Sequence, residues 1–295
     1  MSERTYPIRT ADGRTLSVRE AGAPHGPVVF VLHGTPMSNR LYAPHVEDAQ
    51  RRGLRLIAYD RPGYGGSTPR PGRTIADAAD DVRTIADHLG VDRFGVWGIS
   101  GGGPHALACG AKLSGRARAV AALASPAPYD AKGLDYLADT GEANIEETRA
   151  SLAGAEALEA VIGPQRDAYV RGDRAATDAA MATLLSPVDR AAYSGGLGEY
   201  LFDAARAGLA PGIAGWRDDD IAFVRPWGFA PKEIRVPVTL WQGRQDRFVP
   251  YSHGKWLGEE IGHAVRNLSD EDGHLTLYEH RIPSVHSWLL TYLGR

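Results

Sequence analysis

Five stretches of this chain are continuously apolar and rich in β-branched residues, and they constrain its fold more than any other feature. They cover residues 27–32, 54–59, 94–99, 117–124 and 236–241. An apolar run without alternation is typical of a strand whose two faces are both covered by helices. Since helical patterns separate most of these runs, the sequence predicts an α/β fold around a mostly parallel central sheet flanked by helices.

Other local patterns extend this sheet and its helical layers. Residues 6–10 and 15–19 alternate between polar and apolar side chains around a short Gly-containing turn, which predicts an antiparallel hairpin. Residues 101–113 have small or apolar side chains on every side, so we expect them to form a helix in the interior. A last helix is expected after Pro283, where apolar residues recur at helical spacing.

The pattern of buried strands is interrupted between residues 128 and 232. This stretch has helical periodicity, is rich in Ala, Glu and Asp, and contains no run typical of a buried strand. The strand pattern resumes at Val236. We therefore expect an α/β core made of residues 1–127 and 233–295, with residues 128–232 inserted as a helical cap over the carboxyl edge of the sheet.

A glycine-flanked serine lies where one buried strand meets the helix of small residues, in the pentapeptide Gly98-Ile99-Ser100-Gly101-Gly102. A serine on a sharp strand-to-helix turn needs glycine two residues before and after it, because a Cβ atom there would clash with the neighbouring chain. The turn places the serine hydroxyl at a helix N-terminus, where N–H groups and the helix dipole stabilise a developing anion. Ser100 is therefore the predicted nucleophile.

Several short motifs accompany this pentapeptide. The chain contains HGTP at 33–36, YDRPGYGGS at 59–67, GISGGG at 98–103, WQGRQDRFVP at 241–250 and DGH at 272–274. In this order they resemble the motifs of the α/β-hydrolase superfamily, and the match covers all of the chain except the expected cap. The resemblance implies an α/β-hydrolase fold with a catalytic triad in the chain order Ser, Asp, His.

The resemblance also implies which residues assist Ser100. Asp246 follows the last of the apolar strands and corresponds to the carboxylate that orients the imidazole. His274 corresponds to the general base, in a loop before the terminal helix. Asp130 remains an alternative carboxylate, because some members of the superfamily carry the acid after an earlier strand.

Stabilisation of the oxyanion is expected from two backbone N–H groups. One belongs to Gly101, the residue after the nucleophile, and the resemblance of HGTP to the family's oxyanion loop assigns the other to Thr35. The candidates for contact with substrate are mostly aromatic side chains late in the expected cap. We name as substrate-binding candidates His105, Trp216, Phe223 and Trp227. Packing is the alternative role: within its own helix region for His105, which the sequence favours, and as anchors of the cap on the core for the three aromatics.

A serine at position 100 favours acyl transfer to water, and we expect a small-molecule ester or lactone as substrate. Prolyl iminopeptidases are an alternative: they carry HGGPG where this chain has HGTPM, and they hold the substrate amine with acidic cap residues. Acids in the cap here are typical of solvated faces (Glu142, Glu146, Glu147 and Asp218 to Asp220). A ligand receptor or a non-hydrolytic biosynthetic enzyme built on the same fold is a third hypothesis.

The charge, the cysteine content and the motifs of the sequence indicate which partners, cofactors and compartment to expect. The net charge of −3 does not favour nucleic acid or an anionic membrane surface. A single cysteine, Cys109, excludes an intramolecular disulfide and fits a reducing compartment, and we expect a cytoplasmic protein. Since no metal-ligand spacing or phosphate-binding loop is present, neither a metal nor a cofactor is expected. A homodimer is compatible with the sequence, which does not determine the oligomeric state.

Overall fold

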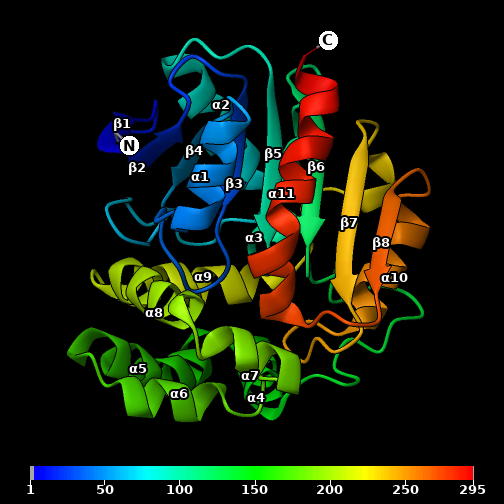
Figure 1. The fold of residues 1–295 in the computed structure, drawn as a ribbon. Coiled ribbons are helices and arrows are strands. Elements are labelled where there is room, and N and C mark those ends of the chain that lie inside the picture. Colours follow the sequence, from blue (N-terminus) through cyan, green and yellow to red (C-terminus); the bar gives the residue numbers. More distant parts are fainter. Residues whose placement is uncertain (1–2, 295) are drawn as a thin grey trace.

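An eight-stranded sheet forms the centre of the protein in the computed structural model, which describes residues 3–294 (Figure 1). Residues 1, 2 and 295, at the outer ends of the expected core, lie outside the described residues. The strand order is β1-β2-β4-β3-β5-β6-β7-β8. The strands are β1 (Arg4–Arg9), β2 (Thr15–Gly22), β3 (Val28–Leu32), β4 (Arg55–Tyr59), β5 (Phe94–Ile99), β6 (Ala117–Leu123), β7 (Val238–Gly243) and β8 (Val265–Ser269).

The five apolar runs of the sequence are strands β3 to β7, and each pairs in parallel with its neighbours among them. The predicted hairpin is also present, since β1 and β2 pair antiparallel with Tyr6 opposite Val18. β2 joins the parallel strands through an antiparallel pairing with β4. The sequence-based prediction of a mostly parallel sheet is therefore confirmed.

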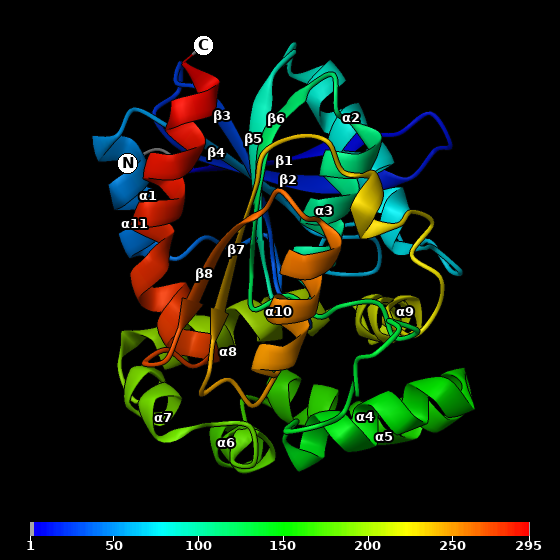
Figure 2. The same cartoon turned by 90° about the vertical axis from the view of Figure 1, so that its right-hand side faces the viewer.

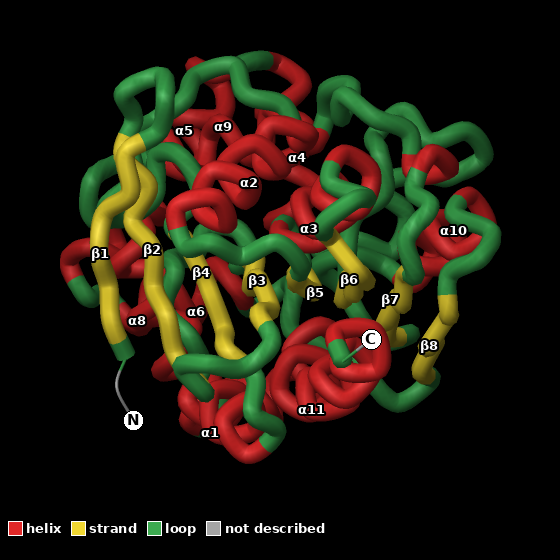
Figure 3. Tube along the Cα trace, turned by 90° about the horizontal axis from the view of Figure 1, so that it is seen from above, coloured by secondary structure: helices red, strands yellow, loops and turns green. Residues whose placement is uncertain are grey.

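Helices cover both faces of this sheet, as a parallel sheet requires. Seen from above, α1 (Ala43–Arg51) and α11 (His274–Leu293) lie on one face (Figure 3). The other face carries α2 (Ala78–His88), α3 (Gly102–Lys112) and α10 (Tyr251–Glu260), with a short 3₁₀ turn, η1 (Ile75–Asp77), before α2 and another, η2 (Pro231–Glu233), before β7. Each face has its own cluster of buried apolar side chains, so the sheet is covered on both sides.

The terminal helix begins earlier than the sequence pattern predicts. α11 starts at His274 and contains Pro283, whereas the prediction placed its start after that proline and left His274 in a preceding loop. Proline in a helix interior removes one backbone hydrogen bond. Burial of Leu277 and Ile282 on one side of Pro283 and of Leu289 on the other packs both halves against the sheet, and this packing keeps the helix continuous.

The chain between β6 and β7 contains a group of helices that lie together beyond the carboxyl ends of the parallel strands (Figures 1 and 2). We call them the inserted helices. They are α4 (Glu142–Ala153), α5 (Ala155–Arg171), α6 (Arg174–Met181), α7 (Pro187–Tyr193), α8 (Gly196–Leu209) and α9 (Ala214–Phe223). A separate apolar cluster holds α4, α5, α8 and α9 together and includes Leu158, Ile162 and Trp216. Among residues 3–294, no helix is both long and apolar enough to cross a membrane.

Candidate active site

Ser100 occupies a tight turn between β5 and α3. Its backbone φ is +54°, in the left-handed region that residues other than glycine rarely adopt. The turn is possible because both flanking glycines lie against backbone: a Cβ atom on Gly98 would collide with the carbonyl of Gly102, and one on Gly102 with the carbonyl of Leu32. The glycines at these positions therefore serve the close approach of three chain segments, as the sequence pattern predicts.

His274 and Asp246 form a buried pair beside this turn. The Nδ1–H of His274 donates to Asp246 Oδ2 across 2.8 Å, and both side chains are almost completely buried. The second carboxylate oxygen of Asp246 accepts from the backbone N–H groups of Phe248 and Val249, each at 2.8 Å. The amide of Gln242 donates to Asp246 Oδ2 at 3.1 Å. These contacts fix the carboxylate and, through it, the tautomer of the imidazole.

The surroundings of His274 act on its pKa in two directions. Burial lowers the pKa, but the negative charge of Asp246 and its hydrogen bond raise it, and the charge of Asp189 adds to the increase. The net effect is a pKa above the ordinary value. The ring also stacks on Phe248, with centroids 4.5 Å apart and planes inclined by 22°.

Ser100 and His274 line the same cavity, which has a volume of about 230 Å³. Within residues 3–294, no hydrogen bond joins the Ser100 hydroxyl to the imidazole. Thr35 and Gly101 also line it. Within the described part of the chain, neither the backbone N–H of Thr35 nor that of Gly101 donates a hydrogen bond to the protein.

Asp130, the alternative carboxylate, makes no hydrogen bond to His274 among the described residues. Two of the four substrate-binding candidates, Trp216 and Phe223, line the cavity. His105 and Trp227, the other two candidates, are not among the residues that line it. Both side chains are buried in the core, His105 on α3 and Trp227 in the chain between α9 and η2.

His105 is directed into the protein from the first turns of α3. Its Nδ1 bonds to the carbonyl of Gly101 at 2.7 Å, and its Nε2 lies 3.7 Å from Asp219. Burial lowers the pKa of His105 to about 3, which keeps the ring neutral. Trp227 packs against Phe229, with ring centroids 5.7 Å apart, and belongs to the apolar cluster of the sheet face.

The acidic run Asp218 to Asp220 is buried, which corrects its interpretation as a solvated face. Asp219 has no exposed surface and forms ion pairs with Arg61 and with Arg73, the latter at 2.6 Å. It also accepts from the hydroxyls of Tyr64 at 2.9 Å and Thr35 at 2.7 Å. Burial raises the pKa of Asp219, but the charges of Arg61 and Arg73 outweigh it and hold the pKa well below its usual range.

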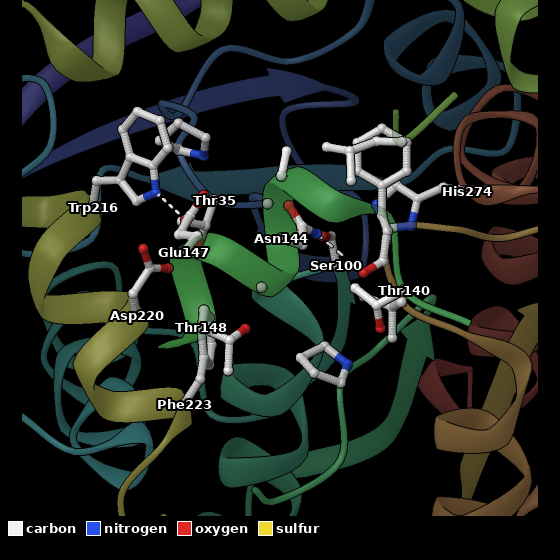
Figure 4. Close-up of a pocket in the computed structure, with 18 of the residues that line it drawn as sticks. Thr35, Ser100, Thr140, Asn144, Glu147, Thr148, Trp216, Asp220, Phe223 and His274 are labelled. Carbon is white, nitrogen blue, oxygen red and sulfur yellow. Dashed lines mark hydrogen bonds between the residues drawn. The ribbon is translucent and has the colours of Figure 1, made fainter. Parts of the chain in front are cut away.

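Two acidic side chains of the inserted helices line the cavity. Asp220 on α9 and Glu147 on α4 both line it, and the indole N–H of Trp216 donates to Glu147 at 2.6 Å (Figure 4). Burial and the neighbouring charge of Glu147 raise the pKa of Asp220 well above its usual range. One carboxylate oxygen of Asp220 is buried without a hydrogen-bond partner in the described residues. The sequence pattern did not distinguish these two acids from surface carboxylates.

The comparisons with known proteins agree with this fold. Residues 27–281 match the family described as alpha/beta hydrolase fold, and the chain belongs to this family. It is 24% identical to the AB hydrolase superfamily protein YisY of Bacillus subtilis, over 93% of this chain and 94% of that protein. A proline iminopeptidase of Xanthomonas citri is 35% identical over a shorter stretch, 36% of this chain and 35% of that enzyme.

A solved structure is similar to this protein in fold over almost the whole chain. The thermophilic esterase of Thermogutta terrifontis superposes with a TM-score of 0.71 over 98% of this chain and 99% of the esterase, at 19% sequence identity. At this level of identity the superposition establishes the fold.

Proposed function

We propose that this protein is a serine hydrolase that cleaves a small-molecule ester through an acyl-enzyme, with Ser100 as nucleophile, His274 as general base and Asp246 as the orienting carboxylate. One observation carries the proposal: a serine at φ +54° shares a cavity with an imidazole whose Nδ1–H is held by a buried carboxylate. An unassisted serine hydroxyl is a poor nucleophile, and a neutral imidazole supplies the missing base.

In the proposed acylation step, Ser100 Oγ attacks the ester carbonyl carbon while His274 Nε2 accepts the hydroxyl proton. Asp246 stabilises the imidazolium that forms, without itself taking the proton. Collapse of the tetrahedral intermediate breaks the bond to the alkoxide leaving group, which receives the proton from His274. Water then attacks the acyl-enzyme with the same imidazole as base, and the carboxylic acid and free Ser100 are regenerated.

The negative oxygen of the intermediate requires preorganised donors. The free backbone N–H groups of Gly101 and Thr35 are suited to this role, because they line the cavity that holds Ser100. Loss of one such donor costs about 2.7–4 kcal/mol of transition-state stabilisation in comparable enzymes. We assign the oxyanion hole to these two groups.

We further propose that residues 128–232 act as a cap that selects the acyl group. Side chains from the inserted helices and their connections form much of the cavity wall, including Asn144, Leu184, Trp216 and Phe223. Since apolar pocket contacts discriminate between acyl groups of different size, these residues are placed to determine substrate choice.

Aminopeptidase activity is a second candidate, and it is favoured by the acids Glu147 and Asp220. In Figure 4 they lie with Trp216 on one side of the cavity, while Ser100 and His274 lie on the other. A protonated amine placed between the two carboxyl groups would satisfy the unpartnered oxygen of Asp220. Such a subsite suits a substrate with a free ammonium group at a distance from its scissile carbonyl.

The first experiment tests the nucleophile. The protein is treated with a fluorophosphonate, and the labelled peptide is identified by mass spectrometry; we expect the label on Ser100 and none on Ser100→Ala. Hydrolysis of p-nitrophenyl acetate should fall by at least about 10³-fold in Ser100→Ala. Labelling at another residue, or equal hydrolysis by both proteins, contradicts the proposal. Labelling without turnover of any ester, lactone or anilide favours a receptor or a non-hydrolytic enzyme.

The second experiment separates the two substrate classes. kcat/KM is measured for p-nitrophenyl esters and for aminoacyl p-nitroanilides, in the parent protein and in Asp220→Asn. If the acids bind an amine, KM for the anilides rises by about 10-fold or more in the variant while the uncharged esters are unaffected. Efficient ester hydrolysis with no anilide cleavage removes the aminopeptidase candidate.

A further inference from the structure

A carboxylate from the inserted helices holds the start of the helix that carries His274. Asp189, on α7, is fully buried. Its two oxygens accept from the first backbone N–H groups of α11: those of His274 at 2.9 Å, Leu275 at 2.8 Å and Thr276 at 3.2 Å. The His274 contact spans 85 residues of sequence. A single side chain therefore satisfies three N–H groups that the helix itself leaves without partners.

The local sequence provides no side chain for this purpose. The residue before His274 is Gly273, at the N-cap position, where Ser, Thr, Asp or Asn ordinarily supplies the accepting oxygen. A Cβ atom on Gly273 would collide with the Asp189 carboxylate. Its φ of −102° is accessible to any residue, so the glycine provides space for Asp189 rather than an unusual backbone conformation. The Asp189 carboxylate therefore takes the place of the N-cap side chain that Gly273 lacks.

Asp189 is itself fixed on its own helix. The Ser186 hydroxyl at the N-terminus of α7 donates to Asp189 Oδ2 at 2.9 Å. Burial raises the pKa of Asp189, while the hydrogen bond from the His274 backbone opposes the increase. The charged and titratable groups that face this position are His274 on α11 and Asp246 in the turn after β7.

We propose that Asp189 is a positioning residue for the general base: it caps α11 from the inserted helices and so sets the place and electrostatic environment of His274. This inference rests on the proposed hydrolase function. It assigns the inserted segment a part in the catalytic machinery, in addition to the selection of substrate. The backbone of His274 is held by Asp189 and its ring by Asp246, so two carboxylates from separate parts of the chain fix one residue.

The test uses Asp189→Asn in the full-length protein, with Asp173→Asn as the matched control. Asp173 caps α6 within the same inserted segment, accepting from Ala176 N–H at 3.0 Å, and does not line the cavity. Three quantities are measured: the titration of the His274 imidazole by NMR, the rate of fluorophosphonate labelling of Ser100, and thermal unfolding. The NMR titration needs no substrate, so it is informative even if the proposed hydrolysis is not found.

We expect Asp189→Asn to lower the pKa of His274 and to slow labelling of the folded protein by about 10- to 100-fold, the size of effect that a small misplacement of a catalytic group produces. Asp173→Asn should change neither quantity. An unchanged His274 titration and labelling rate in folded Asp189→Asn overturns the inference. Failure of the parent protein to label at Ser100 instead overturns the proposed function.

A second variant separates the hydrogen bonds that Asp189 accepts from its negative charge. In Asp189→Ala combined with Gly273→Ser, the carboxylate is gone and the new serine supplies an N-cap at the ordinary position. If Asp189 positions His274 by capping, the double variant labels faster than Asp189→Ala alone, and its His274 pKa stays low because the charge is not restored. Equal labelling rates in the single and double variants argue against the capping role.

Discussion

The carboxylate of Asp219 accepts a hydrogen bond from the Thr35 hydroxyl at 2.7 Å, although 184 residues separate the two in the chain. This contact ties α9 to the loop after β3 that carries a proposed oxyanion donor. The side chain of Arg61 reinforces it, since its Nη2 donates to the same hydroxyl at 3.1 Å. Asp219 thus joins the inserted helices to the core beside the cavity.

Replacement of Asp219 by Asn should destabilise the protein strongly. The change leaves Arg61 and Arg73 buried without their counter-charge, and breaking such a pair costs about 3–5 kcal/mol. Urea unfolding monitored by circular dichroism measures the loss. Asp167→Asn, which removes an exposed partner of Arg166, is the control and should alter the free energy of unfolding by less than about 1 kcal/mol. Similar losses in both variants contradict this account.

The ion pairs of Asp219 with Arg61 and Arg73 should also make the stability of the protein depend on pH. A carboxyl whose pKa is lower in the folded state stabilises the fold above its unfolded pKa, and this stabilisation is lost as pH falls through the folded pKa. We expect the difference in unfolding free energy between the parent protein and Asp219→Asn to be constant near neutral pH and to shrink below about pH 4. A difference that grows on acidification refutes the assignment.

Asp246→Asn should leave the fold intact and reduce kcat by about 10⁴-fold, because the amide no longer holds the imidazole in the tautomer that accepts the serine proton. Steady-state kinetics with p-nitrophenyl acetate measures the effect. Asp130→Asn is the matched control and should retain full activity. The opposite result, with Asp130→Asn inactive and Asp246→Asn active, transfers the acid role to Asp130.

The pH dependence of kcat/KM should report the ionisation of His274. The imidazole acts as a base in its neutral form, so activity falls as pH drops through its pKa. Asp246 and Asp189 raise this pKa above the ordinary 6.5, so the acidic limb should have its midpoint above that value. A pH series with p-nitrophenyl acetate measures the midpoint, and a value well below 6.5 excludes His274 in this environment as the base.

Aromatic residues of the inserted segment should differ in effect according to their contact with the cavity. Trp216→Ala and Phe223→Ala should each change the discrimination between short and long acyl esters by about 1–3 kcal/mol, as lost apolar pocket contacts do. The measurement compares kcat/KM across p-nitrophenyl esters of increasing chain length.

Trp227→Ala is the control for this series, because Trp227 packs in the core outside the cavity. Its removal should lower stability by about 3–5 kcal/mol and leave the order of ester preference unchanged. If all three variants lower kcat/KM for every ester in parallel and unfold at lower temperature, the three aromatic residues are structural, and substrate choice depends on other residues of the cavity.

The sequence by itself determined the sheet and the turn at Ser100. Continuous apolar runs specify buried strands through local composition, and glycine at positions 98 and 102 is required by the turn whatever surrounds it. The motif order also identified Asp246 and His274, which the structure brings within hydrogen-bond distance of each other. The strands and the turn are short-range patterns that one chain segment suffices to recognise, whereas Asp246 and His274 were recognised from the resemblance of the ordered motifs to a known family.

Only the tertiary structure decided which acids are buried and what they hold. In the sequence, Asp219 cannot be distinguished from an aspartate on the surface. It is buried because it pairs with Arg61 and Arg73, which lie more than 140 positions away in the chain. Likewise, Trp216 faces the cavity while Trp227 packs in the core, and Asp189 reaches a helix 85 residues further on. Periodicity reports which face of a helix is apolar, whereas these contacts depend on how the inserted helices pack on the sheet.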